Sequence, residues 1–334
     1  MNQKPKIVVG TLTRNQKERL VRCLDSLSKL DYPNFTLGVV DNHSTDGTVE
    51  ILRERYPQVS YLRHRENLGF GEGINSQIRL AIEAGADYLF TVENDVEADP
   101  RALSLLVEAC EKDPKIGAAF PAVYYSEERN RVWPVRGTSL KDIREEIARS
   151  PLGICLIRME AVKKVGYLDP DYFVFFDDAD WLLRLERAGY VACDVPEARA
   201  WHGPPNSASE DSAGRTYYQT RNRLYFFRKY SPPGYFLLFF LFFLVETFFW
   251  KVPRHFFRGK PRAIQGRVWA WVDFLKGKRR NREFSEISGN VLVRMGRRVL
   301  DFASSAKRKI RFWWKRAAGK PVRIRVRVDW NIGD

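Results

Sequence analysis

Four short apolar segments in the first hundred residues each end abruptly in polar residues and are each followed by a stretch with helical character. They are residues 7–9, 37–40, 59–62 and 88–92. Uninterrupted Val, Ile, Leu and aromatic runs of this length are typical of strands buried on both faces. Four strand–loop–helix units in succession predict an α/β fold with a mostly parallel central sheet flanked by helices and short right-handed crossovers.

The fourth segment stops at Glu93, Asn94 and Asp95. Open α/β sheets bind ligands at the carboxyl ends of their strands. Two carboxylates one residue apart repel each other unless a cation lies between them. Hard oxygen ligands of this kind suit Mg²⁺ or Mn²⁺, which commonly bridge a protein to phosphates. The competing interpretation is a solvated acidic loop.

Two further loops have polar residues where a ligand could bind. Asp41 follows the second strand and has two interpretations: an N-cap of the next helix, or a carboxylate that accepts hydrogen bonds from a nucleobase or ribose. Residues 67–75 are rich in glycine and lead into a helix that we expect to reach Ala84. Glycines there either allow close approach of the backbone to a ligand or form a plain tight turn.

Three carboxylates, Asp177, Asp178 and Asp180, open a predicted helix directly behind the apolar residues 173–176. Capping explains one acid at a helix N-terminus, but three are more than capping needs. A partly buried carboxylate near a bound sugar could act as general base on a hydroxyl group. His202 is either a structural histidine or, together with a carboxylate, part of a divalent-metal site.

These motifs, in this order, resemble the family 2 glycosyltransferases with the GT-A fold, a Rossmann-like arrangement, and especially their rhamnosyltransferase-like branch. The matching segments are residues 11–15, 41–48, 67–75, 85–88, 93–95, 165–169, 176–181, 188–190, 202–203 and 221–223. The resemblance covers roughly residues 5–230, so we expect a catalytic domain over residues 1–230.

The resemblance implies a role for each matched residue. Nucleotide-sugar binding is implied for Thr11, Thr13, Arg14, Asp41, Asn42, Asn67, Gly69, Asn75, Glu93 and Asn94. Metal binding is implied for Asp95 and His202. Glu93 stands where relatives have Asp, which leaves Asp95 as the main ligand. Asp178 is implied as catalytic base, and the acceptor side is implied for Asp177, Asp180 and Trp181. The implied reaction is direct displacement at the anomeric carbon with inversion.

Basic residues concentrate near the C-terminal end. The formal net charge is +15, and residues 251–334 contain 24 Lys and Arg against 6 Asp and Glu. A near-neutral body with a strongly basic extension indicates contact with an anionic surface. Residues 292–317 show apolar residues at helical spacing among Arg and Lys, which predicts an amphipathic basic helix. Residues 322–328 alternate as a half-exposed strand would.

An uncharged run of eleven residues, 235–245, precedes this basic segment and is interrupted by Glu246 and Thr247. A spanning helix needs about 20 apolar residues, so we expect an interfacial or re-entrant segment, with a buried core helix as the alternative. Residues 231–334 are therefore predicted to be a membrane-associating extension, which contacts an anionic membrane surface through residues 235–320. A nucleic-acid-binding tail would explain the charge but not the aromatic run, so we expect no nucleic acid partner.

The sequence thus predicts an inverting transferase that uses Mg²⁺ or Mn²⁺ and a nucleotide-sugar donor such as dTDP-rhamnose or a UDP-sugar. Its acceptor would be a glycolipid or surface polysaccharide at the cytoplasmic face of the cell membrane, with peripheral or re-entrant attachment; a homo-oligomer is compatible with this prediction. Four cysteines without C-x-x-C spacing indicate a reducing compartment and no zinc site. The alternative is a non-catalytic membrane or nucleic-acid-binding adaptor on the same fold. A processive synthase would need a Gln-x-x-Arg-Trp motif, which residues 265–269 do not match.

Overall fold

The computed structural model describes residues 4–127, 129, 151–203 and 213–278. The chain divides into compact units of Met1–Arg282 and Glu283–Asp334, and all that follows concerns the first unit. The helix expected over residues 292–317, the strand over 322–328 and most of the polar stretch 124–151 lie outside the described residues. The expected domain boundary after residue 230 stays a prediction.

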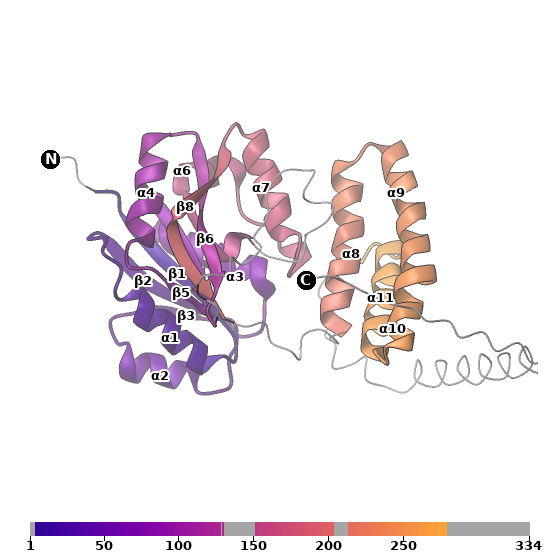
Figure 1. The fold of residues 1–334 in the computed structure, drawn as a ribbon, viewed down its shortest axis with the longest axis horizontal. Coiled ribbons are helices and arrows are strands. Elements are labelled where there is room, and N and C mark those ends of the chain that lie inside the picture. Colours follow the sequence, from indigo (N-terminus) through magenta and orange to yellow (C-terminus); the bar gives the residue numbers. More distant parts are fainter. Residues whose placement is uncertain (1–3, 128, 130–150, 204–212, 279–334) are drawn as a thin grey trace, which may run out of the picture. The chain divides into compact units, whose positions relative to one another are not determined.

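An eight-stranded mixed sheet forms the centre of the fold, in the order β3-β2-β1-β4-β7-β6-β8-β5. Its strands are β1 (Ile7–Thr13), β2 (Phe35–Asp41), β3 (Ser60–Arg63), β4 (Tyr88–Glu93), β5 (Val96–Ala98), β6 (Ile116–Tyr125), β7 (Ile154–Arg158) and β8 (Val191–His202). The first four strands are parallel in space, whereas β7 runs antiparallel to both β4 and β6, and β5 runs antiparallel to β8. The expected mostly parallel sheet flanked by helices is confirmed (Figure 1).

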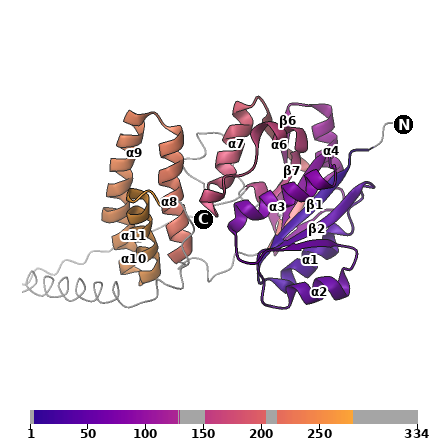
Figure 2. The same ribbon diagram turned by 180° about the vertical axis from the view of Figure 1, so that it is seen from behind.

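Helices cover both faces of this sheet (Figures 1 and 2). They are α1 (Lys17–Leu27), α2 (Thr48–Arg55), α3 (Gly69–Glu83), α4 (Ala102–Lys112), α6 (Met159–Val165) and α7 (Asp177–Arg187), with short 3-10 turns η1 (Pro151–Gly153) and η2 (Pro170–Tyr172). One core cluster joins α1 and α4 to the sheet, and a second joins α3, α6 and α7 to it. The amphipathic spacing of α1 buries Leu20, Leu24 and Leu27 as the sequence predicts.

A group of helices follows the sheet: α8 (Ala213–Tyr230), α9 (Pro233–Val245), the π-helical turn η4 (Glu246–Lys251), α10 (Val252–Phe257) and α11 (Pro261–Leu275). Helices α9, η4 and α10 form one continuous 25-residue helix, Pro233–Phe257, which by length and composition alone could cross a membrane. Glu246 therefore does not end the apolar helix as expected. Most of its apolar side chains are exposed, including Leu238, Phe242 and Phe249, so the alternative of a buried core helix is wrong.

Two segments expected as loops have regular structure. The glycine-rich stretch forms the first turns of α3, because Gly73 lets the helix approach β1: a Cβ there would lie 2.5 Å from Leu12 Cδ1. The stretch around His202 is the end of β8, which stays paired with β6 in parallel up to Tyr125 opposite His202. Both differences come from close non-local packing, which local sequence patterns do not encode.

Candidate active site

Polar residues gather at the carboxyl edge of β1, β2 and β4. The register sets Thr13 opposite Asp41 and Leu12 opposite Glu93. Asn94 follows β4 and donates from Nδ2 to Thr13 Oγ1 at 2.8 Å. The strands thus end side by side in the arrangement that open α/β sheets use to bind ligands.

Three side chains form a compact ligand cluster at this edge. His202 Nε2 lies 3.1 Å from Glu93 Oε2 and 3.6 Å from Asp95 Oδ1, and the potential ligand atoms lie within 4.8 Å of one another. The antiparallel pairing of β5 with β8 sets Val96 opposite His202 and so brings the histidine to the acidic residues. Two carboxylates and an imidazole suit a divalent cation such as Mn²⁺.

The charges and pKa shifts of the cluster suit a bound cation. Burial raises the pKa of Asp95, opposed by His202 and Arg19. Burial alone would lower the pKa of His202, but its hydrogen bond with Glu93 and the charge of Asp95 outweigh that and raise it to about 9. Without a metal, a protonated imidazole balances the two carboxylates. Arg19 Nη1 holds the other oxygen of Asp95 at 2.8 Å.

Asp41 has one oxygen available for a ligand. Its Oδ1 accepts a hydrogen bond from Ser44 N at 3.0 Å. Its Oδ2 is buried without a hydrogen-bond partner in the described part of the chain, with Arg63 Nε 3.4 Å away. The N-cap of α2 is Gly47, and Asp46 accepts from Thr48 N. The capping interpretation of Asp41 is therefore wrong. Its Oδ2, which makes an ion pair with Arg63 but no hydrogen bond, suits a hydroxyl or amine donor of a nucleoside.

Backbone contacts join this edge to the segment before α7. Asn42 Nδ2 donates to Gly69 O at 3.0 Å. Gly69 has φ +87°, and a Cβ there would lie 2.3 Å from Phe173 O, so only glycine fits. Phe70 N donates to Phe173 O at 2.6 Å. The N-terminus of α3 thus connects the end of β2 with the loop that carries the acidic residues.

That loop is strained. Phe173, Phe175 and Phe176 have φ of 64°, 66° and 70°, a region that aromatic residues rarely adopt. Strain of this kind persists only where the surroundings hold it. Asn222 stabilises this loop conformation. Its Nδ2 donates to the carbonyl oxygens of Tyr172 and Val174 at 2.8 Å and of Phe175 at 2.9 Å.

The strained loop sets two buried carboxyl groups at the start of α7. Neither oxygen of Asp177 has a hydrogen-bond partner among the described residues, and burial raises the pKa of Asp177 to about 7. Asp178 is also nearly buried, and its Oδ1 accepts from Ala179 N at 2.7 Å. A buried carboxyl group with a pKa near neutrality has the property that general acid–base chemistry requires.

Comparison with known proteins agrees with this geometry. Residues 8–166 match the model of the family described as "Glycosyl transferase family 2". The chain therefore contains a domain of this family. It is similar to the N-acetylglucosaminyl-diphospho-decaprenol L-rhamnosyltransferase of Mycobacterium tuberculosis, with 29% identity over 240 residues, 61% of this chain and 78% of the relative.

Other relatives of this glycosyltransferase point the same way. The dTDP-rhamnosyl transferase RfbF of Shigella flexneri is 22% identical over 226 residues, covering 62% of this chain and 75% of the relative. The fold is similar to that of the mannosyltransferase PcManGT from Pyrobaculum calidifontis, solved in complex with GDP-Man and Mn²⁺. The TM-score is 0.52 at 17% identity, over 93% of this chain and 84% of that one. The GT-A fold is therefore confirmed.

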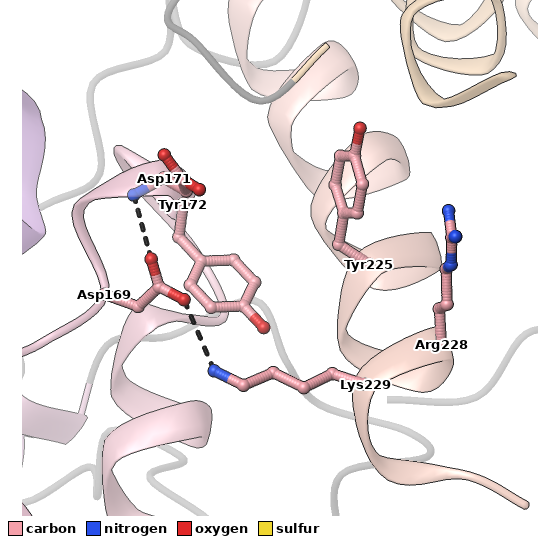
Figure 3. A pocket seen from close by; sticks show the side chains of 6 residues that line it. All are labelled: Asp169, Asp171, Tyr172, Tyr225, Arg228 and Lys229. Carbon is pink, nitrogen blue, oxygen red and sulfur yellow. Dashed lines mark hydrogen bonds and ion pairs between the residues drawn. The ribbon is translucent and has the colours of Figure 1, made fainter. Parts of the chain in front are cut away.

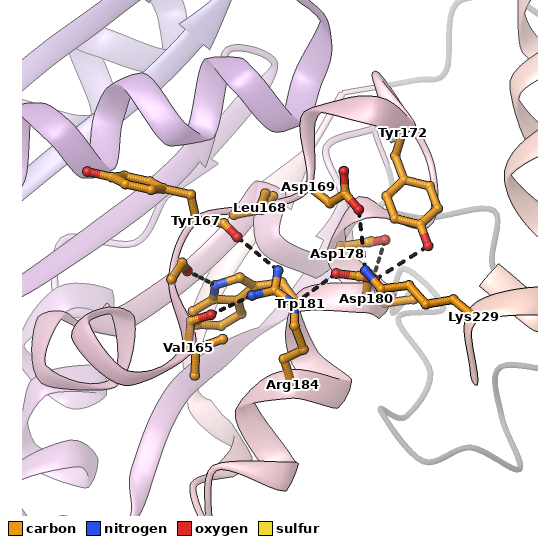
Figure 4. Close-up of polar contacts among 12 residues, drawn as sticks. Val165, Tyr167, Leu168, Asp169, Tyr172, Asp178, Asp180, Trp181, Arg184 and Lys229 are labelled. Carbon is orange, nitrogen blue, oxygen red and sulfur yellow. Dashed lines mark hydrogen bonds and ion pairs between the residues drawn. The ribbon is translucent and has the colours of Figure 1, made fainter. Parts of the chain in front are cut away.

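Some residues expected to contact a substrate of the glycosyltransferase are instead buried and make contacts within the fold. Asp180 is fully buried and contacts Lys229 Nζ at 2.6 Å, Tyr230 Oη at 2.7 Å and Arg184 Nε at 2.9 Å (Figure 4). Trp181 is also fully buried and donates to Gly166 O at 2.9 Å. Neither side chain has surface left for an acceptor, so the structure gives no support to their expected acceptor-side role.

Asn75 is likewise occupied, because its amide exchanges hydrogen bonds with the backbone N and O of Leu168. Thr11 is buried beside Cys23, and Asn67 accepts from Gly69 N within its own turn. Arg14 is exposed just after β1. Direct contact of these residues with a nucleotide stays a prediction.

The sequence analysis missed three contributions to the glycosyltransferase site. Whether Glu93 contacts the metal was left open, because it stands where relatives have Asp, and its carboxylate lies in the ligand cluster. The sequence pattern does not mark Arg19 as a site residue, because it looks like any other polar residue on a predicted amphipathic helix. Asn222 did lie in a recognised motif, but its contact with a loop some fifty residues away could not be read from spacing.

A pocket of about 330 Å³ lies between η2 and α8, next to the Asp180 contacts (Figure 3). Its lining residues are Asp169, Asp171, Tyr172, Tyr225, Arg228 and Lys229. Lys229 is paired with Asp169 at 3.3 Å. None of the expected site residues lines this pocket, and its mixed charge favours no particular ligand.

Proposed function

We propose that this family 2 glycosyltransferase moves a sugar, with inversion, from a nucleotide-sugar donor to a lipid-linked or polysaccharide acceptor at the cytoplasmic face of the membrane. The observation that carries the proposal is the convergence at one sheet edge of the Glu93–Asp95–His202 cluster and Asp41, whose Oδ2 has no hydrogen-bond partner in the described part of the chain. The similarity to an L-rhamnosyltransferase and to a dTDP-rhamnosyl transferase supports a dTDP-linked donor such as dTDP-rhamnose, with a UDP-sugar as the alternative.

Donor binding is divided between the two sides of this edge. Asp41 Oδ2 would accept from the nucleoside, and Asn94 and Thr13 lie between it and the ligand cluster. Asp95, His202 and Glu93 would hold Mg²⁺ or Mn²⁺. When bound, the cation neutralises charge that develops on the leaving diphosphate. The cluster fits such a cation because two carboxylates lie together there, and within the described ranges a protonated histidine and Arg19 balance their charge.

The acidic pair at the start of α7 would supply the base. We propose Asp178 as the group that takes the proton of the acceptor hydroxyl, with Asp177 beside it. Burial keeps the pKa of Asp177 near neutrality, so a proton can reside on this pair and leave it at physiological pH. The hydrogen bonds from Asn222 to the preceding loop fix where these carboxyl groups lie.

Membrane attachment would use the exposed apolar side of α9, η4 and α10. Leu238, Phe242, Phe249 and Phe257 are between 66% and 82% exposed, a concentration of apolar surface that soluble proteins rarely expose. Basic residues lie on α10, between α10 and α11, and in the first turn of α11, namely Arg254, Arg258, Lys260 and Arg262. Apolar anchors beside basic residues suit a membrane surface rich in anionic lipids.

One experiment separates this proposal from a non-catalytic adaptor on the same fold. The full chain is incubated with a panel of nucleotide sugars, with and without Mn²⁺, and release of the nucleoside diphosphate is measured. We expect slow, metal-dependent hydrolysis of one donor. An adaptor would leave every donor intact, and hydrolysis that ignores metal would contradict the proposed ligand cluster.

A further inference from the structure

The π-helical turn η4 places charged residues on the inner side of an otherwise apolar helix. Phe249 and Trp250 are 75% and 68% exposed, whereas Thr247 is fully buried and the side chains of Glu246 and Lys251 are only about a quarter exposed. Wider π-helical turns are uncommon and often lie at functional sites. In η4 the extra width lets two charged residues face the neighbouring helices α8 and α11.

A cation-rich cluster results. Glu246 Oε1 lies 2.8 Å from Lys251 Nζ, and its Oε2 lies 3.9 Å from Arg223 Nη1 of α8. Arg267 of α11 interacts electrostatically with both Glu246 and Arg223. The continuous helix of α9, η4 and α10 lies beside α8 and α11 in both views (Figures 1 and 2). Three cations therefore share one carboxylate, which leaves the cluster with a net positive charge.

The cluster also has unsatisfied hydrogen-bonding groups. Arg223 Nε and Arg267 Nε are buried without a hydrogen-bond partner in the described chain, and so are Thr247 Oγ1 and Trp271 Nε1. Leaving such groups unpaired is unfavourable, because they have lost their hydrogen bonds to water. The Phe243 ring, which lies 4.9 Å from the Arg223 guanidinium and 5.3 Å from Lys251 Nζ, compensates only in part. Glu246 Oε2 is an unpaired acceptor, but the unpaired donors outnumber it and the three cations outnumber the one carboxylate. Both imbalances indicate a missing anionic ligand.

An anion could reach the cluster from the apolar side of the helix. The side chains of Arg223, Glu246 and Lys251 are 23%, 26% and 25% exposed. Glu246 and Lys251 belong to the same helical turn, η4, as Phe249 and Trp250, the residues that would enter a membrane, and Arg223 approaches Glu246 from α8. A charged group at this level would therefore be part of a lipid rather than a solute.

We propose that Arg223, Lys251 and Arg267 bind the phosphoryl group of a membrane lipid. Guanidinium groups suit phosphate oxygens because their N–H donors match the phosphate geometry. The proposal rests on the membrane attachment proposed above and gives it a specific headgroup site. Two lipids carry this chemistry: a bulk anionic phospholipid, and a lipid-diphosphate acceptor of the kind named for the mycobacterial relative.

The position on α8 gives this site a functional consequence. Arg223 directly follows Asn222, whose amide holds the strained loop before Asp177. Successive helical residues point about 100° apart, so one helix presents Asn222 to the catalytic loop and Arg223 to the phosphoryl site. Occupancy of the phosphoryl site would thus fix the helix that positions the acidic pair.

Vesicle binding by the full chain tests the proposal. Vesicles of a neutral galactolipid, which contains no phosphate, are doped with equal negative charge as phosphatidic acid, as polyprenyl diphosphate or as oleate. Oleate supplies charge without a phosphoryl group. We expect the wild-type chain to bind at least one phosphoryl lipid about tenfold more tightly than oleate, the equivalent of one charge-assisted hydrogen bond. Preference for polyprenyl diphosphate alone assigns the site to the acceptor, and preference for both assigns it to phospholipid.

Variants separate the site from general charge attraction. Lys251→Gln and Arg267→Gln should abolish the preference over oleate, and Lys251→Arg should keep it. Arg254→Gln, an exposed cation outside the cluster, should weaken binding to all three anionic vesicles by about fivefold without changing the preference. A wild-type chain that does not distinguish oleate from phosphoryl lipids overturns the proposal, and so does an unchanged preference in both cluster variants. Donor hydrolysis in the same preparations reports separately on the transferase.

Discussion

Asn222 on α8 donates its side-chain amide to the carbonyl oxygen of Phe175 at 2.9 Å, within a loop where three aromatic residues have positive φ. The same amide also contacts two further carbonyl groups of that loop. The loop ends at the acidic pair of α7. A helix outside the sheet therefore determines where the proposed base lies.

Replacing this amide tests its positioning role. Asn222→Leu keeps the size of the side chain but removes all three hydrogen bonds, so the loop should relax and displace the acidic pair. We expect kcat for transfer to fall about 100-fold, the effect of a misplacement near 1 Å, while KM for the donor stays within about twofold. Equal changes in both constants, or none, would argue against a positioning role.

The proposed base is tested directly with Asp178→Asn. The amide cannot take a proton, so transfer should fall roughly 10²- to 10⁴-fold, whereas donor affinity should persist because the ligand cluster is separate. Asp177→Asn is the matched variant one residue away. If Asp178→Asn turns over normally and Asp177→Asn does not, the base is Asp177.

The pH dependence of stability should reveal the burial of Asp177. Its pKa is raised from 3.8 to about 7, so between these values the unfolded chain has lost a proton that the folded chain retains. Stability from this group is complete below about pH 4 and is lost as the pH rises towards 7. The Asp177→Asn variant has no carboxyl group to ionise at this position, so it should not lose this stability as the pH rises.

The free energy of unfolding of Asp177→Asn should therefore exceed that of the wild type by about 1–4 kcal/mol at pH 8, with little difference at pH 4. Urea unfolding at the two pH values measures this. Equal stability of the two proteins at both pH values would show that the carboxyl group is solvated or paired. A gain in stability with a loss of activity would mark Asp177 as a functional residue.

The membrane role of α9 predicts the effect of charges on its exposed side. Leu238→Asp with Phe242→Asp leaves the helix core intact because both residues are about two-thirds exposed. Binding to anionic vesicles should fall about 100-fold or more, since each side chain contributes roughly 1.5–3 kcal/mol on burial. Ile82→Asp on α3, 48% exposed, is the control and should bind normally. Unchanged binding of the double variant would exclude α9 as the anchor.

The sequence predicted what local patterns encode. The first four strands and the helices after them follow from apolar runs and helical spacing, and their order places Asp41, Glu93 and Asp95 at one sheet edge. The resemblance to a known family added Asp178 and His202. The short strand β5 was missed, because three residues carry little signal until they pair with β8.

Contacts between distant segments could not be predicted. The approach of His202 to Glu93 depends on that β5–β8 pairing, so the sequence left open whether Glu93 belongs to the ligand cluster. The full burial of Asp180 and Trp181 depends on α8 and on the turn before α7. Glu246 was expected to interrupt an apolar helix, whereas the π-helical turn directs it inward to Lys251 and Arg223.

The ligand cluster is the centre of this account, and metal-dependent turnover of the donor tests it most directly. The full chain is stripped with EDTA and donor turnover is measured as Mn²⁺ or Mg²⁺ is added back, for the wild type and for Asp95→Asn. We expect no turnover in EDTA and recovery when metal is added. The Asp95→Asn variant should need at least a tenfold higher metal concentration than the wild type to recover turnover. Turnover that persists in EDTA, or a variant with the same metal dependence as the wild type, would contradict the account.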